Sequence, residues 1–155
     1  MVKSGVKWVI FMLMGEYHHS IDDKGRLTIP SKVRDELGTN FIVTRGLDGC
    51  LYIYSESEWQ NVIAKYKELP NIKDARNFMR FFLSGAINGE FDKQGRVKLS
   101  LPLIKYAKLK KECVIIGVND HLEVWDKESW DTLLEANVDD FTEIADKLFD
   151  TRLDV

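Results

Sequence analysis

Two nine-residue stretches decide the fold of this chain, because one is a copy of the other. Ile21-Asp22-Asp23-Lys24-Gly25-Arg26-Leu27-Thr28-Ile29 returns 70 positions later as Phe91-Asp92-Lys93-Gln94-Gly95-Arg96-Val97-Lys98-Leu99. A second block returns at an offset of 71: residues 41–43, 51, 53, 54 and 59 align with residues 112–114, 122, 124, 125 and 130. Two blocks in the same order at nearly the same offset indicate a duplicated module of about 45 residues.

Each copy begins with a predicted hairpin. Residues 16–21 and 26–29 alternate in polarity as strands do, and a turn containing Asp22 and Gly25 lies between them. An Asp side chain can accept a hydrogen bond from the backbone two residues on, and Gly tolerates a positive φ. Residues 89–91 and 96–99 predict the same hairpin in the second copy.

A short helix and a second hairpin complete each module. After Pro30 we expect a helix with Ser31 as its N-cap and Gly38 as its C-terminal stop. Strands over residues 41–44 and 51–54 then form a second hairpin. The second copy repeats this pattern with a helix over residues 103–109 and strands over residues 113–117 and 122–125.

Helical spacing of apolar residues predicts further helices around the modules. Ser55 and Glu58 form a capping-box pattern before a helix that ends by Pro70. Three more helices are expected over residues 73–83, 129–135 and 140–149. We divide the chain into an N-terminal extension (1–14), module one (15–59), linking helices (60–86), module two (87–130) and an acidic C-terminal helical segment (131–155).

Charge is distributed unevenly along the chain. The 155 residues carry a net charge of −3. From Asp126 to the end, ten acidic residues stand against three basic ones, so that segment carries −7 and residues 1–125 carry +4. Nucleic-acid binding needs a positive surface, and this asymmetry indicates where to look for one.

Several classes of protein are disfavoured by the sequence. The longest apolar run, residues 8–14, is far shorter than the roughly 20 residues of a membrane-spanning helix, and no secretory cleavage site follows it. Cys50 and Cys113 match no metal-binding spacing and are expected to stay reduced and buried. His18 and His19, adjacent on a strand, point to opposite faces and make a poor metal site. No catalytic constellation is recognisable, so we expect a cytoplasmic protein that is not an enzyme and needs no cofactor.

The order of the motifs resembles the MraZ family across residues 12–140, nearly the whole chain. The segments that carry the resemblance are Met14-Gly15-Glu16-Tyr17-His18-His19, Asp22-Asp23-Lys24-Gly25-Arg26-Leu27, Ile29-Pro30, Thr44-Arg45-Gly46-Leu47-Asp48-Gly49-Cys50-Leu51, Ala75-Arg76, Phe81-Phe82, Ser84-Gly85-Ala86, Asp92-Lys93-Gln94-Gly95-Arg96, Tyr106-Ala107-Lys108-Leu109 and Ile115-Ile116-Gly117-Val118.

The resemblance implies an α+β fold in which two tandem SpoVT-AbrB-like modules interlock their hairpins in one intrachain barrel with flanking helices. It also implies a ring-shaped homo-oligomer on the nucleoid that binds double-stranded DNA. Such a protein would repress the division and cell-wall gene cluster through direct repeats in its promoter. The DNA-binding residues would be Lys24, Arg26, Lys32, Arg34, Lys93 and Arg96, in turns shaped by Asp22, Gly25, Asp92 and Gly95.

The sequence departs from the family pattern in the second short helix. Ser100 and Ile104 stand where the family often has Pro and Arg, whereas Pro30 and Arg34 of the first copy are intact. We therefore expect module one to carry more of the DNA contact than module two.

Two other interpretations remain open from the residues alone. An Asp-Gly turn with a solvated Arg explains each loop without any DNA, although an Arg at a hairpin tip also suits a guanine edge or a phosphate. A ring-forming scaffold that binds protein partners, with little DNA role, is the alternative function.

Overall fold

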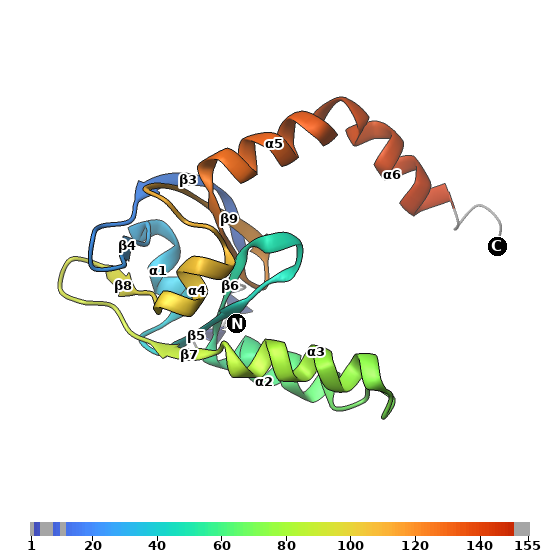
Figure 1. The fold of residues 1–155 in the computed structure, drawn as a ribbon, viewed down its shortest axis with the longest axis horizontal. Coiled ribbons are helices and arrows are strands. Elements are labelled where there is room, and N and C mark those ends of the chain that lie inside the picture. Colours follow the sequence, from blue (N-terminus) through green and yellow to red (C-terminus); the bar gives the residue numbers. More distant parts are fainter. Residues whose placement is uncertain (1, 4–7, 10–11, 151–155) are drawn as a thin grey trace.

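One antiparallel sheet combines strands from both repeats (Figure 1). The computed structural model describes residues 2–3, 8–9 and 12–150. Its six-stranded sheet has the order β3-β9-β10-β6-β5-β7. These strands are β3 (Leu13–Ser20), β9 (Glu112–Asn119), β10 (Leu122–Asp126), β6 (Leu51–Ser55), β5 (Phe41–Arg45) and β7 (Ile87–Gly89). A separate pair of short strands, β1 (Val2–Lys3) and β2 (Trp8–Val9), precedes it.

A two-stranded sheet joins the central strands of the two repeated stretches. β4 (Arg26–Thr28) pairs antiparallel with β8 (Arg96–Lys98), and Leu27 lies directly opposite Val97. Both of these side chains are fully buried. Beyond the strand ends, the backbone N–H of Ile29 donates to the Gly95 carbonyl at 3.0 Å, and that of Leu99 donates to the Gly25 carbonyl at 2.8 Å. The residues that follow the turn of one repeat therefore hydrogen-bond to the turn of the other repeat.

The first hairpin predicted in each module is wrong. β3 pairs along its whole length with β9, and a single bridge between Ile21 and Leu27 connects it to the following strand. Likewise β7 pairs with β5, not with β8. Alternating polarity identifies a strand and its buried face but leaves its partner open, and here the partner comes from the other repeat. The second hairpins, β5–β6 and β9–β10, are confirmed. The described strands form separate sheets, and the closed barrel expected of them is not found.

The short helices begin in different ways. α1 (Ser31–Leu37) has Pro30 at its N-cap without a side-chain hydrogen bond, so the prediction of Ser31 as N-cap is wrong. Ser31 is already the first helical residue, because the fixed φ of Pro30 sets the turn. Gly38, at φ 82°, ends the helix as predicted. α4 (Leu101–Tyr106) begins two residues earlier than expected, because the Ser100 hydroxyl accepts a hydrogen bond from the Leu103 N–H.

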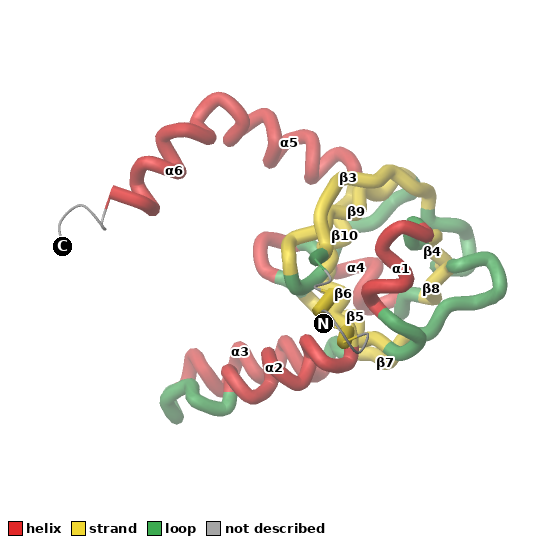
Figure 2. The backbone as a smooth tube through the Cα atoms, turned by 180° about the vertical axis from the view of Figure 1, so that it is seen from behind, coloured by secondary structure: helices red, strands yellow, loops and turns green. Residues whose placement is uncertain are grey.

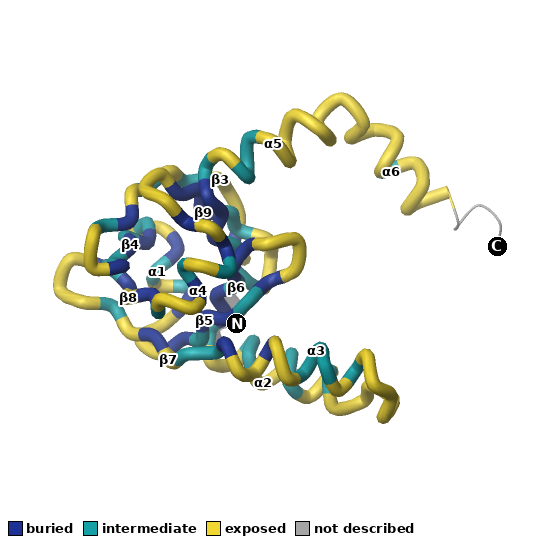
Figure 3. Tube along the Cα trace, in the orientation of Figure 1, coloured by how far each residue is buried: buried dark blue, intermediate teal, exposed yellow. Residues whose placement is uncertain are grey.

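The longer helices project from the sheets (Figures 1 and 2). α2 (Glu56–Tyr66) and α3 (Lys73–Ser84) pack together through a row of aromatic rings that includes Trp59, Phe78 and Phe82. The Ser55 hydroxyl accepts the Glu58 N–H at 3.3 Å, which is half of the predicted capping box. α5 (Lys127–Asn137), a 3-10 turn η2 (Val138–Asp140) and α6 (Phe141–Phe149) extend away from the sheets and are largely exposed (Figure 3).

The core lies between the sheets and the two short helices. Its fully buried side chains come from both repeats, among them Ile29, Val43, Leu99 and Ile115. Cys50 and Cys113 are buried and unpaired with each other, in agreement with their predicted role as small apolar residues. Among the described residues, no helix is long and apolar enough to cross a membrane.

Candidate nucleic-acid interface

Residues 22–26, here called the first loop, form a turn closed by one carboxylate. Asp22 Oδ1 accepts the backbone N–H of Lys24 at 3.0 Å and that of Arg26 at 2.8 Å. Its other oxygen, Oδ2, accepts Nε–H of the Arg26 side chain at 2.6 Å. Gly25 adopts φ 78° and donates its N–H to the Asp22 carbonyl, which is a conformation that side chains with a Cβ resist.

Residues 92–96, the second loop, repeat this geometry. Asp92 Oδ1 accepts the N–H groups of Gln94 and Arg96, each at 2.9 Å, and Oδ2 accepts Arg96 Nε–H at 2.8 Å. Gly95 adopts φ 75°. The same sequence motif therefore produces the same turn twice, with the Arg held by the Asp four residues before it.

Hydrogen bonding lowers the pKa of both loop carboxyls. The largest contribution at Asp22 is the backbone N–H of Arg26, with further hydrogen bonds from the Arg26 side chain and the Lys24 N–H. At Asp92 the corresponding donors are Arg96 and Gln94. Both groups therefore stay ionised at neutral pH, and each holds its arginine in place while offsetting part of its charge.

The two loops lie side by side. Arg96 Nη1 is 3.7 Å from Asp22 Oδ2, so an arginine of one loop reaches the carboxylate of the other. The side chains of Arg26 and Arg96 remain 33% and 24% exposed. Two arginines from positions 70 residues apart therefore lie close together, on β4 and β8, and these strands lie at one edge of the molecule (Figure 1).

The outer face of the β4–β8 sheet carries a further cation. Leu27 and Val97 point into the core, so the residues on either side of them point outward. Lys98 lies directly opposite Arg26, and Arg96 lies directly opposite Thr28. We call Arg26, Arg96 and Lys98 the cationic face. Sequence reasoning missed Lys98, because its position becomes significant only when β4 and β8 are known to pair.

The predicted lysines lie at the edges of this arrangement. Lys24 and Lys93 are exposed within the first and second loops, and Lys32 is exposed on α1. None of them has an ion-pair partner among the described residues.

Arg34 is not where its position in the sequence suggests. Its guanidinium occupies the space that a Cβ on Gly95 would fill, so it lies on the second loop. There it lines a cavity of about 420 Å³ together with Phe91, Asp92 and Lys93. Arg34 belongs to module one in the sequence but lies on the second loop in the structure, because α1 of one repeat covers the turn of the other.

The described residues contain no group of three or more His, Cys, Asp or Glu side chains placed to hold a metal ion. His18 Nε2 lies 2.7 Å from Glu16 Oε2, a neighbour on the same strand.

Comparison with known proteins shows the family of this chain. The family model described as "MraZ protein, putative antitoxin-like" matches the chain twice in tandem, over residues 12–81 and 82–152. A Lactobacillus helveticus (strain DPC 4571) protein named transcriptional regulator MraZ is 51% identical over 143 residues, which cover 92% of this chain and 100% of that protein. With a repeated match over nearly all of its length, the chain belongs to the MraZ family.

Proposed function

We propose that this protein is a sequence-specific DNA-binding transcriptional regulator that represses the division and cell-wall gene cluster. The observation that carries the proposal is the cationic face, in which Arg26, Arg96 and Lys98 project from one surface of a two-stranded sheet. The name of the 51% identical relative, a transcriptional regulator, supports the same class of function.

A two-stranded antiparallel ribbon is a suitable shape for reading DNA. The major groove is about 12 Å wide and admits such a ribbon, and arginine can donate two hydrogen bonds to a guanine edge. The three-residue strands β4 and β8 would lie in or along the groove, with Lys24 and Lys93 of the flanking turns near phosphates. Asp22 and Asp92 would fix the arginines rather than touch the DNA, since a carboxylate is repelled by phosphate.

We further propose that the protein acts as a homo-oligomer, in a ring, on direct repeats in the promoter. One face with a few cations binds weakly, whereas several linked faces can raise avidity by about 10²–10⁴. Exposed apolar residues follow the outer helices and include Val138 at 56% and Phe141 at 74% exposure. Such exposed apolar surface is typical of a contact between proteins.

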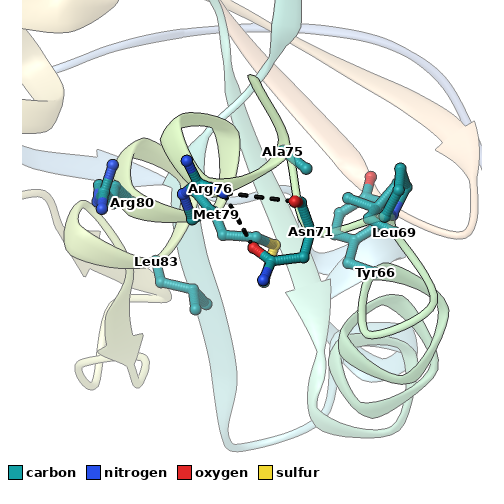
Figure 4. Close-up of a pocket in the computed structure, with 9 residues that line it drawn as sticks. Tyr66, Leu69, Asn71, Ala75, Arg76, Met79, Arg80 and Leu83 are labelled. Atoms are coloured by element: carbon teal, nitrogen blue, oxygen red, sulfur yellow. Dashed lines mark hydrogen bonds between the residues drawn. The ribbon is translucent and has the colours of Figure 1, made fainter. Parts of the chain in front are cut away.

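A groove on the α2–α3 hairpin would receive part of a neighbouring copy. It encloses about 510 Å³ and is lined by apolar side chains such as Leu69, Met79 and Leu83 (Figure 4). Arg76 lies at its rim, where Nη1 donates to Asn71 Oδ1 at 3.0 Å. Because α6 combines apolar and acidic residues, it complements this groove in both polarity and charge.

The remaining features fit a regulator at the chromosome. The acidic helices α5 and α6 extend away from the β4–β8 edge, so their negative charge would not compete with DNA for the cationic face (Figures 1 and 2). A protein that binds promoter DNA works in the cytoplasm at the nucleoid, and the proposed role needs neither enzymatic activity nor a cofactor.

Gel shifts with the protein's own upstream promoter and a random duplex of equal length test DNA binding. We expect preference for the promoter, with a strong loss of that preference for Arg26→Ala and for Arg96→Ala. Lys65→Ala, which removes a cation from α2, is the matched control and should bind as the unaltered chain does. If the unaltered chain shows no preference, the DNA-binding proposal is wrong and the ring-forming scaffold becomes the better interpretation.

Mass measurement in solution tests self-association. Phe141→Glu on α6 should reduce the assembled mass, and Leu83→Glu in the groove should do the same. Thr142→Glu adds the same charge beside Phe141 and serves as the control. An unaltered assembly in both groove and helix variants would contradict this contact between copies.

A further inference from the structure

The two short helices present different side chains to the two loops. Arg34 of α1 lies against Gly95 in the second loop, whereas Ile104 of α4 lies against Gly25 in the first. A Cβ placed on Gly25 would lie 3.1 Å from Ile104 Cδ1. Positions 34 and 104 correspond in the repeat, so the same structural place holds a guanidinium on one side and an aliphatic group on the other.

Hydrogen bonds between the two repeats explain why each short helix lies against the loop of the other repeat. The Ile29 N–H binds the Gly95 carbonyl, and α1 begins two residues later, beside the second loop. The Leu99 N–H binds the Gly25 carbonyl in the same way, and this places α4 beside the first loop. The path of the backbone therefore places Arg34 beside the second loop. The rotamer of its long side chain is not the only reason for this position.

The cavities beside the two loops show the same difference. The one beside the second loop is lined by Arg34, Asp35 and Lys93. Its counterpart beside the first loop encloses about 600 Å³ and is lined by Leu101, Ile104, Lys110 and Lys111, among others.

Summed charge is not what separates the two cavities. Lys110 Nζ is held by Glu128 Oε2 at 2.7 Å and Asp126 Oδ2 at 3.3 Å, which offsets its charge. Among the residues that line the cavities, Lys110 and Lys111 are matched by Asp22 and Asp23 beside the first loop. Beside the second loop, Arg34 and Lys93 are matched by Asp35 and Asp92. The difference is one of chemistry at the turn itself: a planar fork of five N–H donors against a branched hydrocarbon.

We propose that Arg34 is a specificity-determining residue of the second loop and makes the two halves of the DNA-binding face read different chemistry. At the second loop the guanidinium donates to acceptor oxygens or nitrogens of the DNA, on a guanine edge or a phosphate. At the first loop Ile104 offers an apolar contact of the kind that suits a thymine methyl group. The second loop is then the stronger anchor. This reverses the expectation, drawn from the intact Pro30 and Arg34 of the first copy, that module one carries more of the DNA contact. This inference rests on the proposed DNA-binding function.

Binding to a fluorescent duplex of the protein's own upstream promoter tests the assignment. We expect Arg34→Ile to weaken binding about tenfold, the scale of one bidentate arginine contact. Lys93→Gln and Lys24→Gln, in the second and first loops, are then each combined with Arg34→Ile. Neighbouring residues are energetically coupled and distant ones are not. We therefore expect the losses of affinity from Arg34→Ile and Lys24→Gln to multiply in the double variant. The losses from Arg34→Ile and Lys93→Gln should not multiply.

Further variants distinguish the two sources of acceptors. Arg34→Lys retains the charge without the fork, so it should restore binding if the partner is a phosphate and fail to restore it if the partner is a guanine. For a phosphate contact, Arg34→Ile should also reduce the slope of log affinity against log salt by about one. Ile104→Arg, the reciprocal change, should strengthen binding and make the first loop resemble the second in its contact with DNA.

The outcomes separate this inference from the function on which it rests. If the unaltered chain shows no preference for the promoter over a random duplex, both are overturned. If it binds selectively but Arg34→Ile has less than a twofold effect, or couples to Lys24→Gln alone, only the assignment of Arg34 is overturned. Circular dichroism and the assembled mass of each variant, unchanged from the unaltered chain, ensure that a loss of binding reports on the contact.

Discussion

The guanidinium of Arg34 covers Gly95, so a residue of the first repeat completes the turn of the second. The reciprocal contact of Ile104 with Gly25 is made by the second repeat on the first. Together with the β4–β8 pair, these contacts mean that neither repeat contains a complete loop environment of its own. The duplication therefore produces one interlocked structural unit with two related but unequal loops.

Gly95→Ala should destabilise the protein and displace Arg34. Alanine at φ 75° is strained by about 1 kcal/mol, and its Cβ would overlap the guanidinium. Gly38→Ala is a matched control, because Gly38 has φ 82° but no atom lies within 4 Å of an added Cβ. Urea unfolding should show a lower free energy of unfolding for both variants, whereas promoter affinity should fall only for Gly95→Ala. Equal affinity of the two variants for DNA would contradict the placement of Arg34.

Leu27→Ala should weaken both repeats at once. Leu27 is fully buried opposite Val97, and removal of a large core side chain costs about 2–5 kcal/mol. Thr28→Ala, on the outer face of the same strand, should cost far less. We expect one unfolding transition at a lower urea concentration, with the same midpoint by tryptophan fluorescence and by circular dichroism. Two separate transitions would indicate repeats that fold independently.

Both thiols should resist alkylation in the folded protein. Burial raises the pKa of Cys113 to about 12 and raises that of Cys50 further, so almost no thiolate is present near pH 8. Mass spectrometry after treatment with iodoacetamide should find an unmodified native chain, and two modified cysteines once the chain is unfolded in guanidinium chloride. Rapid labelling of the native chain would mean that these strands open readily.

The loop aspartates should contribute to stability only above the acidic range. Their folded pKa is lowered relative to the unfolded value of about 3.9, so the contribution is present above that value and is lost as pH falls through the folded pKa. Asp22→Asn should therefore destabilise the protein at pH 7, and the difference from the unaltered chain should shrink below pH 4. Carbon NMR of the Asp22 carboxyl should show a midpoint below the usual Asp range. A midpoint at or above that range would contradict the hydrogen bonding in the first loop.

Most local elements could be predicted from the sequence. The β5–β6 and β9–β10 hairpins, the end of α1 at Gly38 and the start of α2 after Ser55 depend on residues close together in the chain. Turn chemistry, capping and periodicity act over a few residues and are therefore visible in a sequence. The N-cap at Pro30 instead of Ser31 shows the usual uncertainty of such boundaries.

The partners of β3, β4 and β8 could not be predicted in this way. Two copies of one motif offer equivalent strands, and alternation of polarity suits a partner in the same repeat as well as one in the other. The role of Lys98 on the outer face and the contact of Arg34 with the second loop could not be predicted for the same reason, since both follow from the pairing of β4 with β8.

By itself the sequence determined the duplicated turns, their Asp–Arg pairs and the unequal residues at positions 34 and 104, because each depends on short-range hydrogen bonding or on residue identity alone. Only the tertiary structure decided which turn each short helix covers and which cations share a face. Those relationships come from burying Leu27 against Val97 across 70 residues of chain, a packing choice between equivalent partners that no local pattern can express.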